Sequence, residues 1–292
     1  MGISEALVRG NRACNYSAMV VMTFTLYDWI STAEEEVLQI WMRPWSNLKS
    51  LYIFIRFLSI GAQMVPGVIA FLPSSVDLLA PISNRRCHWI IALQGASNQL
   101  LMMAVQIILL LRVEALYQKE KLLQLLLRAL YIGEFISMAV MFSLEMPKVQ
   151  FGLQCVTTQF PINFAIPYFL LPVVVEFIFF VLTMMKFYRA IHDGWARQPL
   201  VFRFLQDGIW AFALPLVILT INIICTAALS GPFSSIAFSW TIAIPGFAGC
   251  RLILNMSHLL RRHAEGPLTY PPQDFQVDTE LLSERHATAS NI

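Results

Sequence analysis

Charged residues are scarce in this sequence, and their scarcity excludes most classes of soluble protein. Only 13% of the 292 residues are charged, 57% are hydrophobic, and the formal net charge is +2. A soluble domain carries nearer a quarter of charged residues, so this chain cannot coat one large globule with polar surface. The repeats of collagen and coiled coils, and the charge excess of a disordered chain, are missing as well. A multi-pass membrane protein remains, and the small net charge argues against nucleic acid as a partner.

The residue patterns of several membrane enzymes and pigments are also missing. The sequence contains no GxSxG, P-loop or dinucleotide-binding motif, and its last lysine, Lys186, comes too early for a Schiff base in a seventh helix. An intramembrane zinc hydrolase needs several ligands at one depth, but the histidines fall in loops, at span ends or in the tail: His88, His192, His258, His263 and His286. We therefore expect no enzymatic activity, no cofactor and no metal site.

Long apolar segments dominate what is present. A helix that crosses the hydrocarbon core needs about 20 mostly apolar residues. Seven segments qualify, at 14–32, 51–72, 89–111, 122–144, 162–185, 208–229 and 234–256. The first is the weakest, because its uninterrupted apolar part begins at Ser17 and ends at Asp28. An alternating barrel pattern never occurs, so the sequence predicts an all-α fold, a seven-transmembrane helix bundle.

The lysines and arginines of the connecting segments predict the orientation of the bundle, because cytoplasmic loops carry the excess of them. Eleven lie on the side opposite the N-terminus and five on its own side (Arg9, Arg12, Arg85, Arg86 and Lys148). The N-terminus is therefore expected outside and the C-terminus in the cytoplasm. Residues 1–16 become a short extracellular N-terminus, 17–260 the membrane domain, and the polar residues 261–292 a disordered cytoplasmic tail.

Three of the five cysteines, Cys14, Cys87 and Cys155, are expected on the outer side, where disulfides persist. Cys87 stands at the outer mouth of the third helix and Cys155 lies in the loop between the fourth and fifth helices. A bridge between them would pin that loop to the third helix. Two free thiols, or a pairing of either with Cys14, are the alternatives. Cys225 and Cys250 lie inside helices and are expected to be packing residues.

The sequence YDWISTAEEEVLQIW at 27–41, followed by RF at 56–57, resembles the signature of a fungal family of multi-pass proteins with a domain of unknown function. LRVEALY at 111–117 and CRLILNM at 250–256 extend the resemblance to about residues 16–260. The resemblance implies a seven-helix membrane protein of unestablished activity, found in basidiomycetes and sometimes described as receptor-like.

The seven spans, the outer N-terminus and the two outer cysteines together resemble the layout of G-protein-coupled receptors. The sequence departs from rhodopsin-like receptors, since Arg112-Val113-Glu114 replaces the acidic-Arg-aromatic triplet at the end of the third helix. This layout favours a receptor-like sensor in the plasma membrane, coupling a small external ligand to a cytoplasmic partner such as a heterotrimeric G protein. A transporter or channel, or a membrane scaffold, is the alternative.

Ionisable residues inside membrane spans are costly and are by default candidates for function. Asp28, Arg56, Arg112 and Arg251 map to the inner ends of their helices and predict an ionic cluster in which Asp28 bridges one or two arginines. The alternative is that the arginines reach individually to lipid phosphates. Glu34, Glu35 and Glu36, which follow, are assigned instead to a short interfacial helix.

Deeper polar residues predict either a ligand pocket or hydrogen bonds between helices. Glu134 and Glu176 lie near the middles of the fourth and fifth helices, where a cationic ligand or a proton relay is one interpretation and an interhelical hydrogen bond the other. Gln94, Asn98 and Gln106 fall on one face of the third helix, because residues four apart share a face. That stripe is expected to point into the bundle.

Overall fold

The computed structural model describes residues 2–42, 44–71, 84–117, 119–151, 157–159, 162–192, 199–229 and 231–264. The chain divides into a unit Met1–Asn255 and a unit Met256–Ile292. Cys155 and most of the predicted tail (265–292) lie outside the described residues. The tail therefore stays a prediction.

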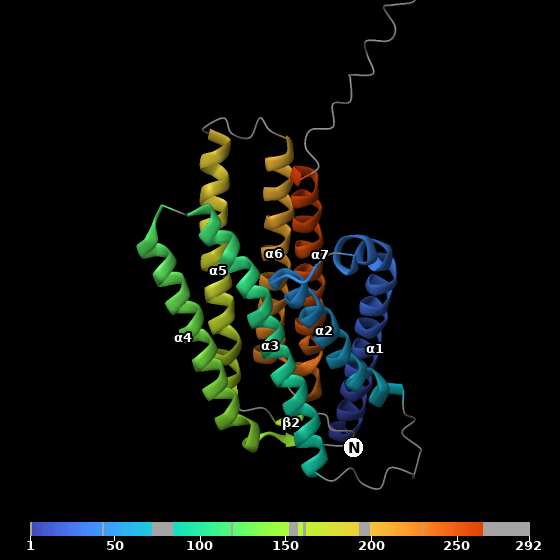
Figure 1. Ribbon diagram of the computed structural model, residues 1–292. Coiled ribbons are helices and arrows are strands. Elements are labelled where there is room, and N and C mark those ends of the chain that lie inside the picture. The colour runs from blue at the N-terminus through green and yellow to red at the C-terminus, as the bar shows by residue number, and fades with distance from the viewer. Residues whose placement is uncertain are drawn as a thin grey trace, which may run out of the picture. The chain divides into compact units, whose positions relative to one another are not determined.

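The described residues form seven α-helices. Within the first unit, which includes α7 as far as Asn255, they run side by side (Figure 1). Their bounds are α1 Gly2–Glu36, α2 Asn47–Phe71, α3 Asn84–Leu116, α4 Lys121–Glu145, α5 Ile162–His192, α6 Pro199–Ala228 and α7 Phe238–Ala264. Short helical turns adjoin three of them: the π-helix η1 Val37–Trp41 and the 3₁₀ turns η2 Met146–Lys148 and η5 Gly231–Ser235. The all-α architecture expected from the apolar runs is confirmed.

One small β-hairpin interrupts the helical pattern. Strands β1 (Gln150–Phe151) and β2 (Thr157–Gln159) pair antiparallel between α4 and α5, with Gln150 opposite Gln159. The hairpin lies at the same end of the helices as the N-terminus (Figure 1). It is too short for the alternating apolar pattern by which strands are detected in a sequence.

Helix α3 is the centre of the bundle and α4 lies at its edge. About two thirds (67%) of the apolar window of α3 is buried, against 17% for α4. The exposed residues of α4 are large and apolar, among them Leu122, Leu125 and Ile136. So much exposed apolar surface would be a liability in water, and it suits a helix that faces lipid.

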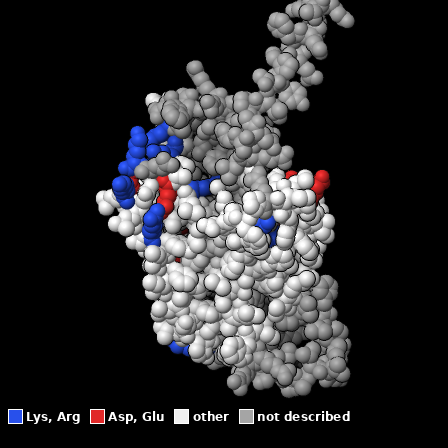
Figure 2. Space-filling view, viewed as in Figure 1, with Lys and Arg blue, Asp and Glu red and all other residues white. Residues whose placement is uncertain are grey.

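Six helices are long and apolar enough to cross a membrane: Asn47–Val65, Cys87–Leu116, Lys121–Lys148, Ile166–Arg189, Ile209–Ala228 and Phe233–Ser257. Figure 2 shows lysines and arginines gathered where α3 is followed by α4, next to a broad uncharged band on this face. These features indicate an integral multi-pass membrane protein. The expected first span, at 14–32, is not among the six, because polar side chains lower the hydropathy of α1.

Helix α1 nevertheless runs alongside α7 over a long distance. At one level, Ser17 Oγ donates to the carbonyl of Ile236 (2.9 Å) and accepts from Trp240 Nε1 (3.2 Å). Eleven residues further along both helices, Asp28 meets Arg251. Since a helix rises 1.5 Å per residue, the two helices lie parallel for about 16 Å. The first and last helices are therefore neighbours.

The helical structure at the N-terminal end of the chain is longer and more continuous than the sequence indicated. Helix α1 begins at Gly2, so residues 2–16 are helical and belong to the same helix as the segment 14–32. The short helix expected between the first two spans follows α1 without a break, as the π-helix η1; its place at the membrane interface stays a prediction. The polar residues near Gly2 hid this extension, since they carry no apolar periodicity for a sequence-based assignment to follow.

Two glycines of α7 allow it to approach its neighbours closely. A Cβ atom on Gly246 would lie 2.5 Å from Ser59 Oγ of α2, and one on Gly249 would lie 3.0 Å from a Val105 methyl of α3. Real Cβ atoms essentially never come within 3.0 Å of such neighbours. Small residues at helix contacts are the usual basis of close packing in membranes. The missing side chain at Gly246 therefore allows α7 to lie this close to α2.

Candidate functional site

The candidate site begins with a row of polar residues on α1. Asp28, Thr32 and Glu36 follow each other at intervals of four residues, so they share one face of the helix. All three are buried, with at most 5% of each residue exposed. The Thr32 hydroxyl lies 2.8 Å from the Asp28 carbonyl and 3.2 Å from Glu36 Oε1. The row presents two carboxylates to α2.

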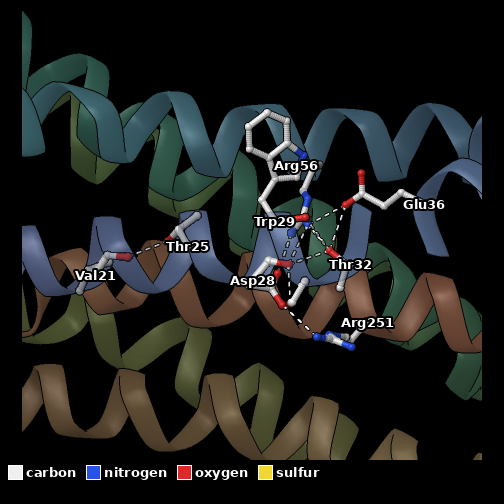
Figure 3. Close-up of polar contacts among 9 residues, drawn as sticks. Val21, Thr25, Asp28, Trp29, Thr32, Glu36, Arg56 and Arg251 are labelled. Carbon is white, nitrogen blue, oxygen red and sulfur yellow. Dashed lines mark hydrogen bonds and ion pairs between the residues drawn. The ribbon is translucent and has the colours of Figure 1, made fainter. Parts of the chain in front are cut away.

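Arg56 of α2 occupies the centre of this row (Figure 3). Its Nη1 donates to Asp28 Oδ2 at 2.7 Å, and its Nη2 is 2.6 Å from Glu36 Oε1. The same Nη2 donates to Thr32 Oγ1. The planar guanidinium thus bonds both carboxylates at once, which a lysine ammonium would do less well. Only 4% of Arg56 is exposed.

Arg251 joins the row from α7. Its Nη2 lies 3.2 Å from Asp28 Oδ1, and its guanidinium lies over the Phe247 ring at 5.6 Å from the ring centre. The Arg251 side chain is 41% exposed, whereas that of Asp28 is 6% exposed. Asp28 is therefore bonded by a buried arginine on one side and by a more accessible one on the other. We call Asp28, Thr32, Glu36, Arg56 and Arg251 the ionic cluster.

The charges of the ionic cluster balance, with two carboxylates against two guanidinium groups. This balance matters because a buried charge without a partner is expensive. Removing one member of a buried pair typically costs about 3–5 kcal/mol, since its partner is left uncompensated. The cluster consequently holds α1, α2 and α7 in one arrangement.

A small cavity adjoins the ionic cluster. Its lining includes Phe24, Asp28, Arg56, Ser59 and Cys250. About 10 Å³ is open to the centre of a water molecule, which is room for roughly one water. A ligand of ordinary size does not fit beside the cluster in this conformation, so the cluster is better suited to joining helices than to binding a substrate.

The sequence predicted three of the five members of the cluster. Asp28, Arg56 and Arg251 come together as expected, and Asp28 bridges two arginines. Arg112 is buried on α3, and none of the bonds described above involves it. Thr32 and Glu36 were missed, because Glu36 was grouped with its exposed neighbours. The four-residue spacing from Asp28 was the signal that could have identified both.

The polar stripe of α3 points into the bundle as predicted, but its members have separate partners. Gln94, Asn98 and Gln106 are all buried. Asn98 Oδ1 accepts from the Thr241 hydroxyl of α7 (3.2 Å), while Gln106 Nε2 donates to Glu134 Oε1 of α4 (3.0 Å). The stripe thus divides between two interfaces.

The structure describes four of the five cysteines. Cys87 is buried at the start of α3, and its predicted partner, Cys155, lies outside the described residues. Cys14, Cys225 and Cys250 are free. A bridge from Cys14 to either outer cysteine, one of the alternatives, is therefore wrong. The bridge between Cys87 and Cys155 stays a prediction.

Comparison with known proteins gives one match. Residues 16–61 match the model of a family of unknown function, DUF6533. No curated protein and no solved structure matches the chain. The matched segment contains Asp28, Thr32, Glu36 and Arg56, whereas Arg251 lies outside it. The segment that resembles this family is therefore the one that builds most of the ionic cluster.

Proposed function

We propose that this protein is a receptor-like sensor with seven spans, which couples an external ligand to a cytoplasmic partner such as a heterotrimeric G protein in the plasma membrane. The observation that carries this proposal is the ionic cluster. It ties the first, second and seventh helices together by bonds that can be exchanged. Asp28 is shared by two arginines, so one bond can break while the carboxylate keeps a partner.

Such a cluster suits a switch between two helix arrangements. A ligand shifts an equilibrium only by binding one conformation more tightly than the other. Arg251 can leave Asp28 more easily than Arg56 can, because its side chain is 41% exposed and can find other partners for its charge. Movement of α7 away from α1 would release it, and Pro245 supplies a kink for such a movement.

The seven-span count is supported by the pairing of α1 with α7. The two helices stay in contact from Ser17 and Trp240 to Asp28 and Arg251, and α7 contains one of the six apolar spans. A helix that follows a membrane span over this length occupies the same depth of the bilayer. We infer that α1 crosses too, with the N-terminus outside, and that Cys87 and Cys155 form a bridge on that side.

Cysteine labelling tests this topology. We expect a membrane-impermeant maleimide to label Glu5→Cys in intact cells, and Glu34→Cys only after permeabilisation. Both positions are exposed at opposite ends of α1. The background for both variants replaces Cys14 and Cys225 with serine, and this background alone gives the unlabelled control. Labelling of both positions from the same side would mean that α1 does not cross the membrane.

Signalling is tested by nucleotide exchange on a fungal Gα subunit reconstituted with the protein in nanodiscs. We expect Asp28→Asn to raise exchange in the absence of ligand several-fold, because the amide cannot hold both arginines. Arg112→Ala in the same protein is expected to abolish that increase if the inner end of α3 contacts the partner.

Glu145→Gln is the matched control for the signalling assay. It also replaces a buried carboxylate in an ion pair, 2.7 Å from Lys148 Nζ, but at the opposite end of the bundle. Its exchange rate is expected to equal that of the unmodified protein. Folded Asp28→Asn protein that leaves exchange unchanged on several Gα subunits would contradict the sensor proposal.

A further inference from the structure

A second group of buried polar residues lies between α3, α4 and α5, separate from the ionic cluster. Glu134 of α4 and Glu176 of α5 are 2% and 1% exposed, and Gln106 of α3 is 1% exposed. Gln106 Nε2 donates to Glu134 Oε1 at 3.0 Å. Helix α5, which carries Glu176, packs against both α3 and α4, and the Glu134 carboxyl group is close enough to that of Glu176 to interact with it electrostatically. All three residues belong to candidate membrane spans.

The oxygens of this group lack donors. Both carboxyl oxygens of Glu176, Glu134 Oε2 and Gln106 Oε1 are buried without a hydrogen-bond partner among the described residues. Four acceptor atoms and a single donated bond make the site strongly electronegative. Two carboxylates in hydrocarbon would be very costly without a compensating positive charge.

The described side chains around the site show no positive group bonded to it. On α4 the other titratable neighbour is Tyr131, whose hydroxyl is bonded to the Met103 carbonyl. In the described side chains of α6 (209–228), Cys225 is the one titratable group. Arg112 lies further along α3, about 9 Å beyond Gln106 by helix rise, and Arg128 is bonded to Glu114 (2.6 Å). Among the described residues no charged donor is bonded to these four oxygens, and a cation from outside the chain can take that place.

We propose that Glu134, Glu176 and Gln106 form a binding site for one monovalent cation, either a proton or Na⁺. Calcium takes six to eight oxygen ligands and magnesium demands an octahedron, whereas this site offers four unpartnered oxygens and two carboxylates. A proton taken from water converts one carboxylate to a neutral acid, and Na⁺ neutralises one charge through oxygen contacts. One negative charge remains in either case, and it is shared by the two carboxyl groups and stabilised by the bond that Gln106 Nε2 donates to Glu134. Ionisable residues inside membrane proteins mark ion and proton sites in general. The site does not depend on the proposed signalling role.

Infrared difference spectroscopy of the full chain in nanodiscs tests the proposal. If the cation is a proton, the unmodified protein shows the carbonyl stretch of a protonated carboxylic acid at neutral pH in a sodium-free buffer. That band is expected to be lost in Glu176→Gln or Glu134→Gln. Glutamine has the same size and needs no cation, so both variants are expected to fold. Glu145→Gln, whose carboxylate is bonded to Lys148, is the matched control and leaves the band unchanged.

Thermal unfolding tests whether the bound cation is Na⁺. If the cation is Na⁺, the band is absent in NaCl, and the unmodified protein melts at a higher temperature in NaCl than in choline chloride. Glu176→Gln then loses this difference, while Glu145→Gln keeps it. A band that survives in both Glu176→Gln and Glu134→Gln overturns the proposal. So does an unmodified protein with neither the band nor a dependence on Na⁺.

Discussion

Replacing Arg56 with methionine is expected to lower the free energy of unfolding by about 3–5 kcal/mol, because it leaves two buried carboxylates without their shared partner. Arg56 bonds Asp28 at 2.7 Å and Glu36 at 2.6 Å, and Arg251 can compensate only the first of them. Methionine keeps an unbranched apolar stem and removes the guanidinium group with its charge. The measurement is an unfolding curve of the purified protein in nanodiscs, with unfolding induced by heat or by denaturant.

Arg128→Met provides the matched control. Arg128 also forms an ion pair, with Glu114 at 2.6 Å, but its side chain is 59% exposed. We expect a much smaller shift there, because solvent takes over the interactions of an exposed charge. Adding Glu36→Gln to Arg56→Met is expected to recover part of the loss, since one uncompensated carboxylate disappears. Equal shifts for Arg56→Met and Arg128→Met would mean that the ionic cluster contributes nothing special to stability.

Gly246→Ala is the second substitution with a large expected effect, although it adds only one methyl group. The new Cβ would lie 2.5 Å from Ser59 Oγ and 2.8 Å from Ser59 Cβ. Overpacking of this kind typically costs about 1–3 kcal/mol. Because α7 would be pushed from α2, the bond between Gln63 Nε2 and the Ser239 carbonyl (2.7 Å) is expected to weaken too. The loss is measured as a shift in the unfolding curve.

Two further variants separate crowding from other effects of the added methyl. Gly133→Ala on α4 places its Cβ where no atom lies within 4 Å, so it is expected to be neutral or slightly stabilising through helix propensity. Ser59→Gly removes both crowded atoms and is expected to restore stability when combined with Gly246→Ala. Absence of any rescue would show that the close approach of α2 and α7 is not the cause.

The sequence predicted the helices well because the membrane makes their signal strong. Six spans were recognised from apolar length alone, and their approximate positions agree with α2–α7. Asp28, Arg56 and Arg251 were grouped because ionisable residues are rare in such spans and were mapped to one depth. A charge that must be paired in hydrocarbon limits the possible partners to a few residues.

The rest depended on information that periodicity does not carry. Glu36 looked like its exposed neighbours Glu34 and Glu35, and only contact with Arg56 distinguishes it. The polar start of α1 at Gly2 has no apolar pattern, so its helical state was not predicted. The division of the α3 stripe between Thr241 and Glu134 follows from which helices lie beside α3. Neighbours distant in sequence cannot be read from one helix.

The pairing of α1 with α7 has a consequence for how the protein is made. The bond between Asp28 and Arg56 can form as soon as the second helix has left the ribosome, but Arg251 is synthesised about 195 residues later. For most of its synthesis the chain therefore carries an α1 whose second face is open to lipid or to other proteins. A chain that stops before α7 keeps this face of α1 uncovered, and we expect it to be degraded faster than the complete chain.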